Sequence, residues 1–247
     1  MNIDQILLLA STTGTWVTVG IIFFTLREMA KQRKASYQPV IVPKQQNVNG
    51  VKNPLVSVDF PTLWSEKHPD EIGKEEINFT YCLRLFNLGN GAAKNIRVKW
   101  DFDISKSITE INELCKQTSQ DIKVVVDKSH FMMISGNQAP LSATSINLDK
   151  EGNYDHLLPA NIENTGLNVP LPAAFIDLVS LRIHLIYQGK QIIDYQPKII
   201  LSLKYQDIAG INYSAKFLLK LKIVSVGGPS EKGNVLIFGG LLTHQKP

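Results

Sequence analysis

Cysteine and histidine are scarce in this sequence, and their scarcity limits the chemistry that the chain offers. The 247 residues include two cysteines and five histidines. Cys82 and Cys115 stand far apart, without the spacing of a redox or zinc motif, so we expect two ordinary, partly buried thiols. The histidines show neither the i, i+4 spacing of a helical zinc site nor an H-E-x-x-H motif. We therefore expect no metal site and no disulfide framework.

The common catalytic and phosphate-binding motifs are missing as well. The sequence contains no phosphate-binding G-x-x-x-x-G-K-[ST] loop, no G-x-G-x-x-G helix start and no G-x-S-x-G elbow. Asp101 and Asp103 would share a strand face, but basic neighbours on that face favour surface ion pairs over a cation site. His184 is expected on the polar side of a strand. A triad built from distant residues stays open, but we expect no enzyme, no catalytic residue and no cofactor.

Charge is missing from Ile6 to Leu26, a run that includes Gly14 and Trp16. A helix rises about 1.5 Å per residue, so this run would be roughly 30 Å long, which matches the hydrocarbon core of a bilayer. A cleaved signal peptide would start with basic residues and end in a small-residue cleavage site, and both are lacking here. A buried core helix is the other alternative. We expect an uncleaved transmembrane helix within residues 1–36.

Positive charge is concentrated directly after this run. Residues 27–52 carry six Lys or Arg side chains against one acid, whereas residues 53–247 carry equal numbers of both signs. Such flanking basic residues stay in the cytoplasm and contact anionic headgroups. We therefore expect a single-pass protein of the inner membrane with a cytoplasmic C-terminal domain. The expected headgroup contacts are Arg27, Lys31, Arg33 and Lys34. Because the domain itself is neutral, we do not expect it to bind nucleic acid.

Within the domain, basic residues gather near the C-terminus. Alternation places several lysines on one face of two neighbouring strands. These are Lys198, Lys204, Lys216, Lys220 and Lys222. One interpretation is a face for lipid, phosphate or an acidic partner. The other, which we favour, is that lysines protect an exposed sheet face or edge from aggregation.

Alternating hydrophobicity predicts a mainly β domain over residues 55–247, after a polar linker over residues 37–54. Expected strands are Leu55–Phe60, Ile77–Asn87, Asn95–Asp103, Ile122–Val126, His130–Ile134, Leu181–Tyr187, Lys198–Tyr205, Tyr213–Val226 and Asn234–Leu242. A helix over Ile108–Gln117 would start with a capping box of Ser107 and Glu110. A brief helix is expected at Ala173–Val179, and residues 135–172 read as loops with short strand pieces. Strands separated by turn signals favour an antiparallel β-sandwich.

Two short motifs carry a resemblance. Residues 87–96 (NLGNGAAKNI) join two expected strands, and residues 205–210 (YQDIAG) precede Tyr213. Asn and Gly suit tight reversals between antiparallel strands. The two motifs resemble turns of bacterial single-pass membrane proteins with an immunoglobulin-like β-sandwich domain, most of which are uncharacterised. The resemblance implies the anchored layout and the sandwich fold, and it brings no catalytic residues.

Three hypotheses for function follow. The favoured one is a non-enzymatic, membrane-tethered module that binds or senses a cytoplasmic protein. The alternative is a membrane effector of an anti-phage or toxin-like system, which would oligomerise through small residues of the helix. These residues are Ala10, Gly14 and Thr18, with Ser11 and Thr15 on a neighbouring stripe. The third hypothesis is an enzyme with an unrecognised site in the loops of residues 135–172.

Overall fold

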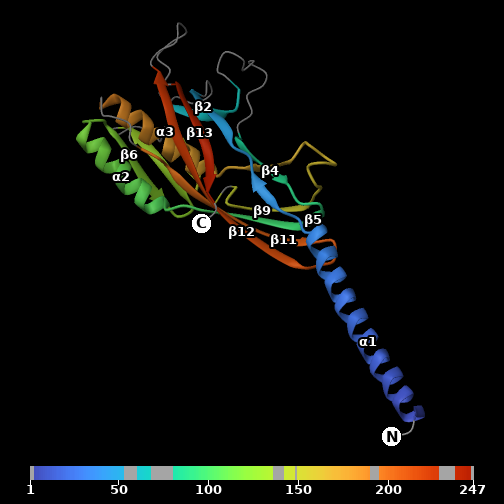
Figure 1. Ribbon diagram of the computed structural model, residues 1–247. Helices are drawn as coiled ribbons and strands as arrows, with labels where there is room; N and C mark the ends of the chain where they lie inside the picture. Colours follow the sequence, from blue (N-terminus) through green and yellow to red (C-terminus); the bar gives the residue numbers. More distant parts are fainter. Residues whose placement is uncertain are drawn as a thin grey trace.

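The computed structural model describes residues 3–52, 60–67, 80–135, 142–147, 149–189, 195–227 and 237–245. Its described part is mainly β, with three helices and antiparallel sheets (Figure 1). The helices are α1 (Ile3–Ser36), α2 (Ile104–Gln117) and α3 (Ala173–Gln188). The expected strand Leu55–Phe60 and the start of Ile77–Asn87 lie largely outside the described residues.

Three sheets contain the strands. A seven-stranded sheet has the order β3-β2-β13-β12-β11-β5-β9, and two three-stranded sheets have the orders β1-β4-β10 and β6-β7-β8. The strands of the large sheet are β2 (Gln46–Lys52), β3 (Pro61–Ser65), β5 (Ala93–Asp101), β9 (Glu151–Leu157), β11 (Lys198–Asp207), β12 (Asn212–Gly227) and β13 (Ile237–Gln245). The small sheets contain β1 (Ile41–Pro43), β4 (Cys82–Asn87) and β10 (Leu167–Pro170), and β6 (Ile122–Asp127), β7 (His130–Ser135) and β8 (Ser142–Ser145).

The expected alternation in β5 is confirmed. Ile96, Val98 and Trp100 are buried, and the residues between them are exposed. The expected strands at β6, β7, β11 and β12 are confirmed too, and β11 and β12 pair as an antiparallel hairpin. The expected strand Asn234–Leu242 is confirmed from Ile237 onward, as β13, whereas residues 234–236 lie outside the described residues. Half-buried strands show their period in the sequence because one face meets the core and the other meets water.

Helix α3 lies between two hydrophobic cores. Phe175, Val179 and Ile183 pack with the large sheet and with the sheet of β1, β4 and β10. Leu178 and Leu181 pack with α2, β6 and β7 on the other side. The predicted strand Leu181–Tyr187 is therefore wrong, and so is the predicted end of the helix at Val179. A helix that is buried nearly all round shows no polar face, so its period of 3.6 is hidden.

Two further details differ from the sequence prediction. His184 is buried in α3 rather than placed on a polar face. Helix α2 begins earlier than expected, and Asp103 caps it by accepting a hydrogen bond from the Lys106 backbone N–H at 2.9 Å. The proposed capping box of Ser107 and Glu110 is therefore wrong. An Asp at this position is as good a cap as Ser or Thr, so the sequence offered both solutions.

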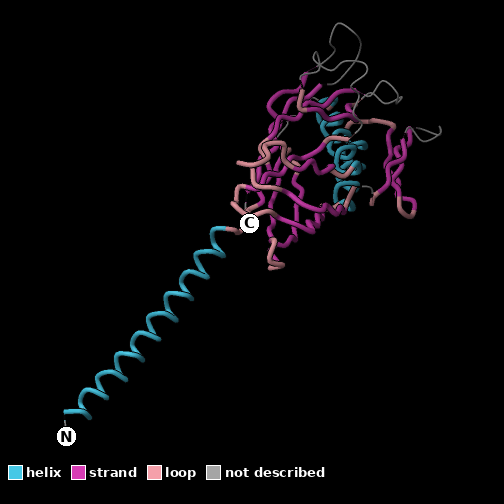
Figure 2. The backbone as a smooth tube through the Cα atoms, turned by 90° about the vertical axis from the view of Figure 1, so that its right-hand side faces the viewer, coloured by secondary structure: helices cyan, strands magenta, loops and turns pink. Residues whose placement is uncertain are grey.

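The linker expected over residues 37–54 contains β1 and β2, which pair with β4 and β13. Strand β2 is polar but is held by backbone pairing, and buried Gln46 bonds the Arg84 N–H at 2.8 Å. The domain therefore begins within a few residues of the end of α1. Figure 2 shows α1 extending away from the sheets with no other described element beside it.

The described part of the chain contains no helix that combines the length and the sustained hydrophobicity needed to cross a bilayer. The side chains of residues 4–12, which include Ile6, Ala10 and Ser11, lie outside the described residues.

Candidate functional site

The described side chains of α1 are exposed on every side, although many of them are large and apolar. From Trp16 to Met29, the exposed apolar residues are Trp16, Val17, Val19, Ile21, Ile22, Phe23, Phe24, Leu26 and Met29. Trp16, for example, is 76% exposed. The polar hydroxyls of Thr18 and Thr25 bond to carbonyls of the same helix, those of Gly14 and Ile21, at 2.8 Å. The surface of α1 thus offers few unsatisfied polar groups.

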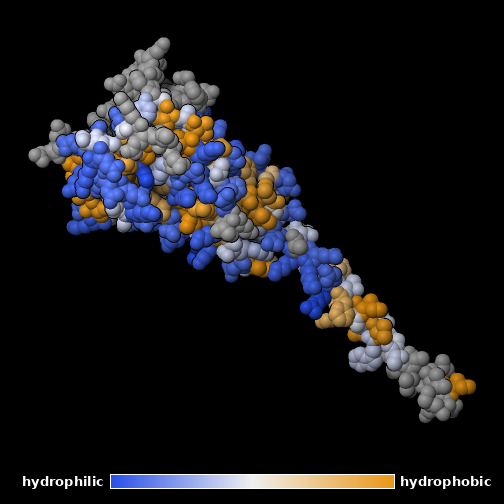
Figure 3. Space-filling model, turned by 60° about the vertical axis from the view of Figure 1, so that its left-hand side comes forward, coloured by the Kyte–Doolittle hydropathy of each residue, from blue (hydrophilic) through white to orange (hydrophobic). Residues whose placement is uncertain are grey.

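The four expected headgroup residues follow directly. Arg27, Lys31, Arg33 and Lys34 are all exposed. Lys31 pairs with Glu28 at 3.4 Å. In Figure 3 a hydrophilic collar separates the apolar part of α1 from the domain. The structure therefore places the basic residues in the last part of α1, between its apolar part and the folded domain.

Asn87 is the centre of the junction between α1 and the domain. Its side chain is fully buried. The Oδ1 atom accepts hydrogen bonds from the backbone N–H groups of Val40, at 2.9 Å, and Gly89, at 3.1 Å. The Nδ2 atom donates to the carbonyls of Gly91, at 2.7 Å, and Leu157, at 3.3 Å. One side chain thereby links the residue before β1, the 87–91 loop and the end of β9.

The two glycines of this loop allow the chain after α1 to approach closely. A Cβ atom on Gly91 would overlap the carbonyl oxygen of Tyr37, and one on Gly89 would overlap that of Gln38. Neither glycine has a positive φ; in this motif the positive φ belongs to Asn95, at 51°. The glycines are therefore required by contact rather than by turn geometry.

The second motif closes the same junction from the other side. The Tyr205 hydroxyl donates to the Pro39 carbonyl at 3.4 Å, and its ring stacks on Tyr213 with centroids 5.6 Å apart. The Tyr213 hydroxyl donates to buried Asp207 at 3.1 Å. Gly210 takes a φ of 86° in the β11–β12 turn, as the sequence predicted for a turn glycine.

The two motifs, more than 100 residues apart, therefore meet at one place. The sequence suggested a hairpin at residues 87–96, but β4 and β5 belong to different sheets, so that part of the prediction is wrong. What the motifs share is the segment 37–40, which both of them bind. No signal in the sequence linked them, because the contact depends on the fold of the intervening residues.

Exposed apolar loop residues surround this junction. Leu88 follows Asn87 and donates its N–H to the Val40 carbonyl at 2.8 Å. Ile162 lies on a loop tied to Asn87 through the Ala160 N–H, at 2.8 Å, and Ile208 is the tip of the β11–β12 turn. These three side chains are between 63% and 70% exposed. Their loops are hydrogen-bonded to Asn87 or to the segment 37–40, or follow a strand that is.

The five lysines of the expected partner face lie together on the outer side of the large sheet. Lys198 and Lys220 are direct cross-strand neighbours, and Lys216 faces Ser202. On the next strand, Arg97 is opposite Lys204 and Lys99 is opposite Ser202. Lys99 also pairs with Glu151 at 2.8 Å; this hydrogen-bonded ion pair raises the pKa of Lys99 and lowers that of Glu151. The structure thus adds Arg97 and Lys99 to the predicted face.

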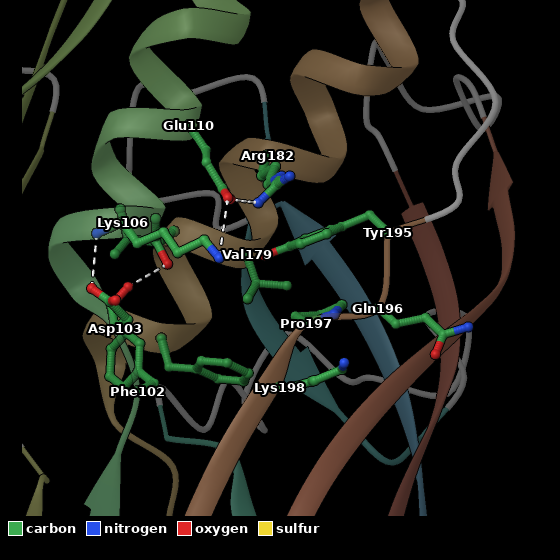
Figure 4. A pocket seen from close by; sticks show the side chains of 13 residues that line it. Phe102, Asp103, Lys106, Glu110, Val179, Arg182, Tyr195, Gln196, Pro197 and Lys198 are labelled. Atoms are coloured by element: carbon green, nitrogen blue, oxygen red, sulfur yellow. Dashed lines mark hydrogen bonds and ion pairs between the residues drawn. The ribbon is translucent and has the colours of Figure 1, made fainter.

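A cavity of about 310 Å³ lies between α2, α3 and the start of β11 (Figure 4). Glu110 forms ion pairs with Arg182 and Lys106, and the Arg182 guanidinium lies 4.0 Å from the centroid of the Tyr195 ring. Burial raises the pKa of Tyr195, and Arg182 opposes that shift. These charged side chains pair with each other, so we interpret the cavity as part of the packing contact between α2 and α3.

Asp177 is the most perturbed carboxyl group among the described residues. Burial raises its pKa to about 6, while the Thr144 hydroxyl, which donates to it, opposes the shift. It ties α3 to β8. No group of three or more His, Cys, Asp or Glu residues in the described ranges is placed to hold a metal ion.

Comparison with known proteins gives no relative for this chain. It matches no protein-family model, no curated protein sequence and no solved structure. A function is therefore inferred from the junction, from α1 and from the basic residues on the outer side of the large sheet.

Proposed function

We propose that the protein is a single-pass, membrane-anchored binding module, whose β domain lies in the cytoplasm and recruits a protein partner to the inner face of the membrane. The observation that carries this proposal is the apolar surface of α1, which is exposed on all sides and joined to the domain through a basic collar. Neither catalysis nor a cofactor is part of the proposal.

The apolar surface of α1 needs an apolar environment. Burying one large apolar side chain stabilises by about 1.5–3 kcal/mol, and a helix that is apolar on all sides is found in a protein core or in a membrane. The internal bonding of Thr18 and Thr25 suits such an environment. Lipid is the surrounding that also explains the basic collar of Arg27, Lys31, Arg33 and Lys34, because cationic side chains bind anionic headgroups.

The junction supports a role for the domain at the membrane surface. The segment 37–40 is held by both motifs, so the domain starts where the helix ends. Leu88, Ile162 and Ile208 place exposed apolar side chains on loops next to this junction. We further propose that the large sheet and the sheet of β1, β4 and β10 form an immunoglobulin-like sandwich, consistent with the core that they share.

Membrane extraction tests the anchor. We expect the full-length protein to remain in the membrane pellet after alkaline carbonate and to enter solution only with detergent. The double variant Val17→Lys/Ile21→Lys should be extracted without detergent, because each central lysine costs about 3 kcal/mol in a membrane helix. The control Gln32→Lys/Ser36→Lys adds the same charge to the collar and should stay in the pellet. Extraction of the wild type by carbonate would contradict the proposal.

Protease accessibility tests the orientation. The domain should be cleaved in inside-out vesicles and protected in right-side-out vesicles, because the basic collar stays in the cytoplasm. Cleavage only in right-side-out vesicles would contradict the cytoplasmic placement. Crosslinking in intact cells, followed by detergent purification, then tests whether a cytoplasmic protein is bound.

A further inference from the structure

We propose that the outer face of β5, β11 and β12 binds an acidic segment of the partner protein. This face, the basic sheet face, contains Arg97, Lys99, Lys198, Lys204, Lys216, Lys220 and Lys222. The inference rests on the proposed function and specifies the chemistry of its partner.

The register puts like charges directly opposite one another. Lys198 faces Lys220 across β11 and β12, and Lys204 faces Arg97 across β11 and β5. Directly opposed like charges destabilise a strand pair. A bound anionic segment removes that cost, so the face favours an acidic ligand.

Acidic side chains on the same face neutralise only part of this charge. Glu151 pairs with Lys99, Asp101 lies opposite Ile200, and Asp155 is on β9 at the border of the face. Among the described residues, no acid forms an ion pair with Lys198, Lys204, Lys216 or Lys222, and Lys220 donates to the neutral Gln245 at 2.9 Å.

Protection of a sheet edge does not explain these lysines. Within the described part of the chain, the sheet ends at β3 and β9, whereas β12 and β11 are interior strands. Their backbone groups are already paired on both sides, so no edge is open there. The interpretation favoured from the sequence therefore loses half of its basis.

An apolar pair lies in the middle of the face. Ile200 and Leu218 are cross-strand neighbours and are only partly buried. Basic residues flank this pair on both sides along the strands. Lys198 and Lys220 form the next pair on one side, and Lys216, opposite Ser202, lies on the other. An apolar centre with a charged rim is the usual anatomy of a protein interface.

The shape of the face fits an extended polypeptide. Residues i and i+2 are about 6.8 Å apart along a strand and neighbouring strands are about 4.8 Å apart, so the face measures roughly 27 Å by 10 Å. The outer positions of β5, β11 and β12, all of them described, carry no aromatic side chain. Binding of single-stranded nucleic acid normally uses aromatic stacking platforms, so a polypeptide is the better match.

Peptide binding to the full-length protein tests this inference. The protein is placed in nanodiscs of neutral lipid, and the probe is a fluorescent peptide of alternating glutamate and leucine, followed by anisotropy. We expect binding that weakens with added salt. The variant Lys216→Glu/Lys220→Glu should bind at least about tenfold more weakly. Its thermal unfolding checks that the fold is intact.

The matched control is Lys116→Glu/Lys123→Glu, which changes the same charge on α2 and β6, outside the large sheet. It should bind the peptide within about twofold of the wild type. Equal loss in both variants, or no binding by the wild type, would overturn the inference. Binding of oligothymidylate in place of the peptide, with the same variant dependence, would overturn it in favour of nucleic acid.

The outcome is separable from that of the proposed function. Incorporation into nanodiscs is recorded first, by co-elution with lipid. If the protein is recovered without lipid or detergent, the anchor fails, and the same peptide titration still decides the fate of the basic sheet face. If the protein co-elutes with lipid but ignores the peptide, only the inference fails.

Discussion

Helices α1 and α3 are both rich in large apolar residues, yet their surroundings are opposite. Eleven residues of α3 are buried, and its neighbours are two hydrophobic cores, one on each side. The apolar residues of α1 from Trp16 to Met29 are exposed. The difference shows that an apolar composition favours burial of a helix, whereas the fold determines whether other parts of the same chain bury it.

This contrast identifies α1, and not α3, as the helix that bears on function. The domain buries most of α3, so α3 contributes to the stability of the fold. It leaves α1 uncovered, so α1 points to something outside the chain, which we propose to be lipid. The junction around Asn87 joins these two regions.

The largest difference between the two helices is expected when one apolar side chain is shortened in each of them. Leu181→Ala, at a position with 0% exposure, should lower the free energy of unfolding of the domain by about 2–5 kcal/mol because it leaves a cavity. Ile21→Ala in α1 should change it by less than about 0.5 kcal/mol. Denaturant unfolding in detergent measures both. Equal losses would show that α1 packs in the domain.

Removing the side chain at the centre of the junction should have the next largest effect. Asn87→Ala leaves two N–H groups and two carbonyls without their partner. We expect a loss of about 2–4 kcal/mol, since each buried group left unpaired costs about 1–3 kcal/mol and water relieves part of it. Asn153→Ala, on the exposed face of β9, is the control and should be neutral within about 0.5 kcal/mol. An unchanged unfolding midpoint for Asn87→Ala would remove the junction from our account.

Matched glycine substitutions compare the close contact at the junction with the open surface of α1. Gly91→Ala places a Cβ atom against the Tyr37 carbonyl and should destabilise by about 1–3 kcal/mol. Gly14→Ala in α1 meets no atom within 4 Å and should be neutral or slightly favourable to the helix. Thermal unfolding and limited proteolysis after residue 34 provide the readout. If Gly91→Ala is tolerated as well as Gly14→Ala, the close approach is not required.

The last effect is confined to a pH range and concerns the carboxyl group of Asp177 in α3. The pKa of Asp177 is raised from 3.8 to about 6 by burial, so the folded state holds its proton more tightly than the unfolded state. Stability from this group is therefore full at low pH and falls as the pH rises from about 4 to about 6, by about 1–3 kcal/mol. Asp177→Asn should remove this fall and should be more stable than the wild type at pH 7. Denaturant titrations at several pH values measure it, and parallel curves for both proteins would contradict the assignment.

Some of the fold could be predicted from the sequence. Strand β5 was visible because water and core alternate along it, and β11 and β12 were visible for the same reason. The continuation of α3 was not predicted, because burial on all sides erased its polar face. Strand β2 was missed because its polar residues are held by partners, such as the Arg84 backbone for Gln46, that no local pattern reveals.

The candidate site divides in the same way. The basic residues on β11 and β12 were found from alternation alone. Alternation predicts that Arg97 and Lys99 share one face of their strand. Their position opposite Lys204 and Ser202 depends on strand order. The meeting of the two motifs at residues 37–40 depends on the whole fold. Local patterns therefore indicate both motifs but not the segment that both of them bind.

The clamp around Asn87 also has a mechanical consequence. A helix of 34 residues is a lever about 50 Å long. Because both motifs bind residues 37–40, the chain directly after this lever is hydrogen-bonded to the domain. If α1 lies in a membrane as proposed, we expect a change in its tilt to reorient the basic sheet face relative to a bound partner.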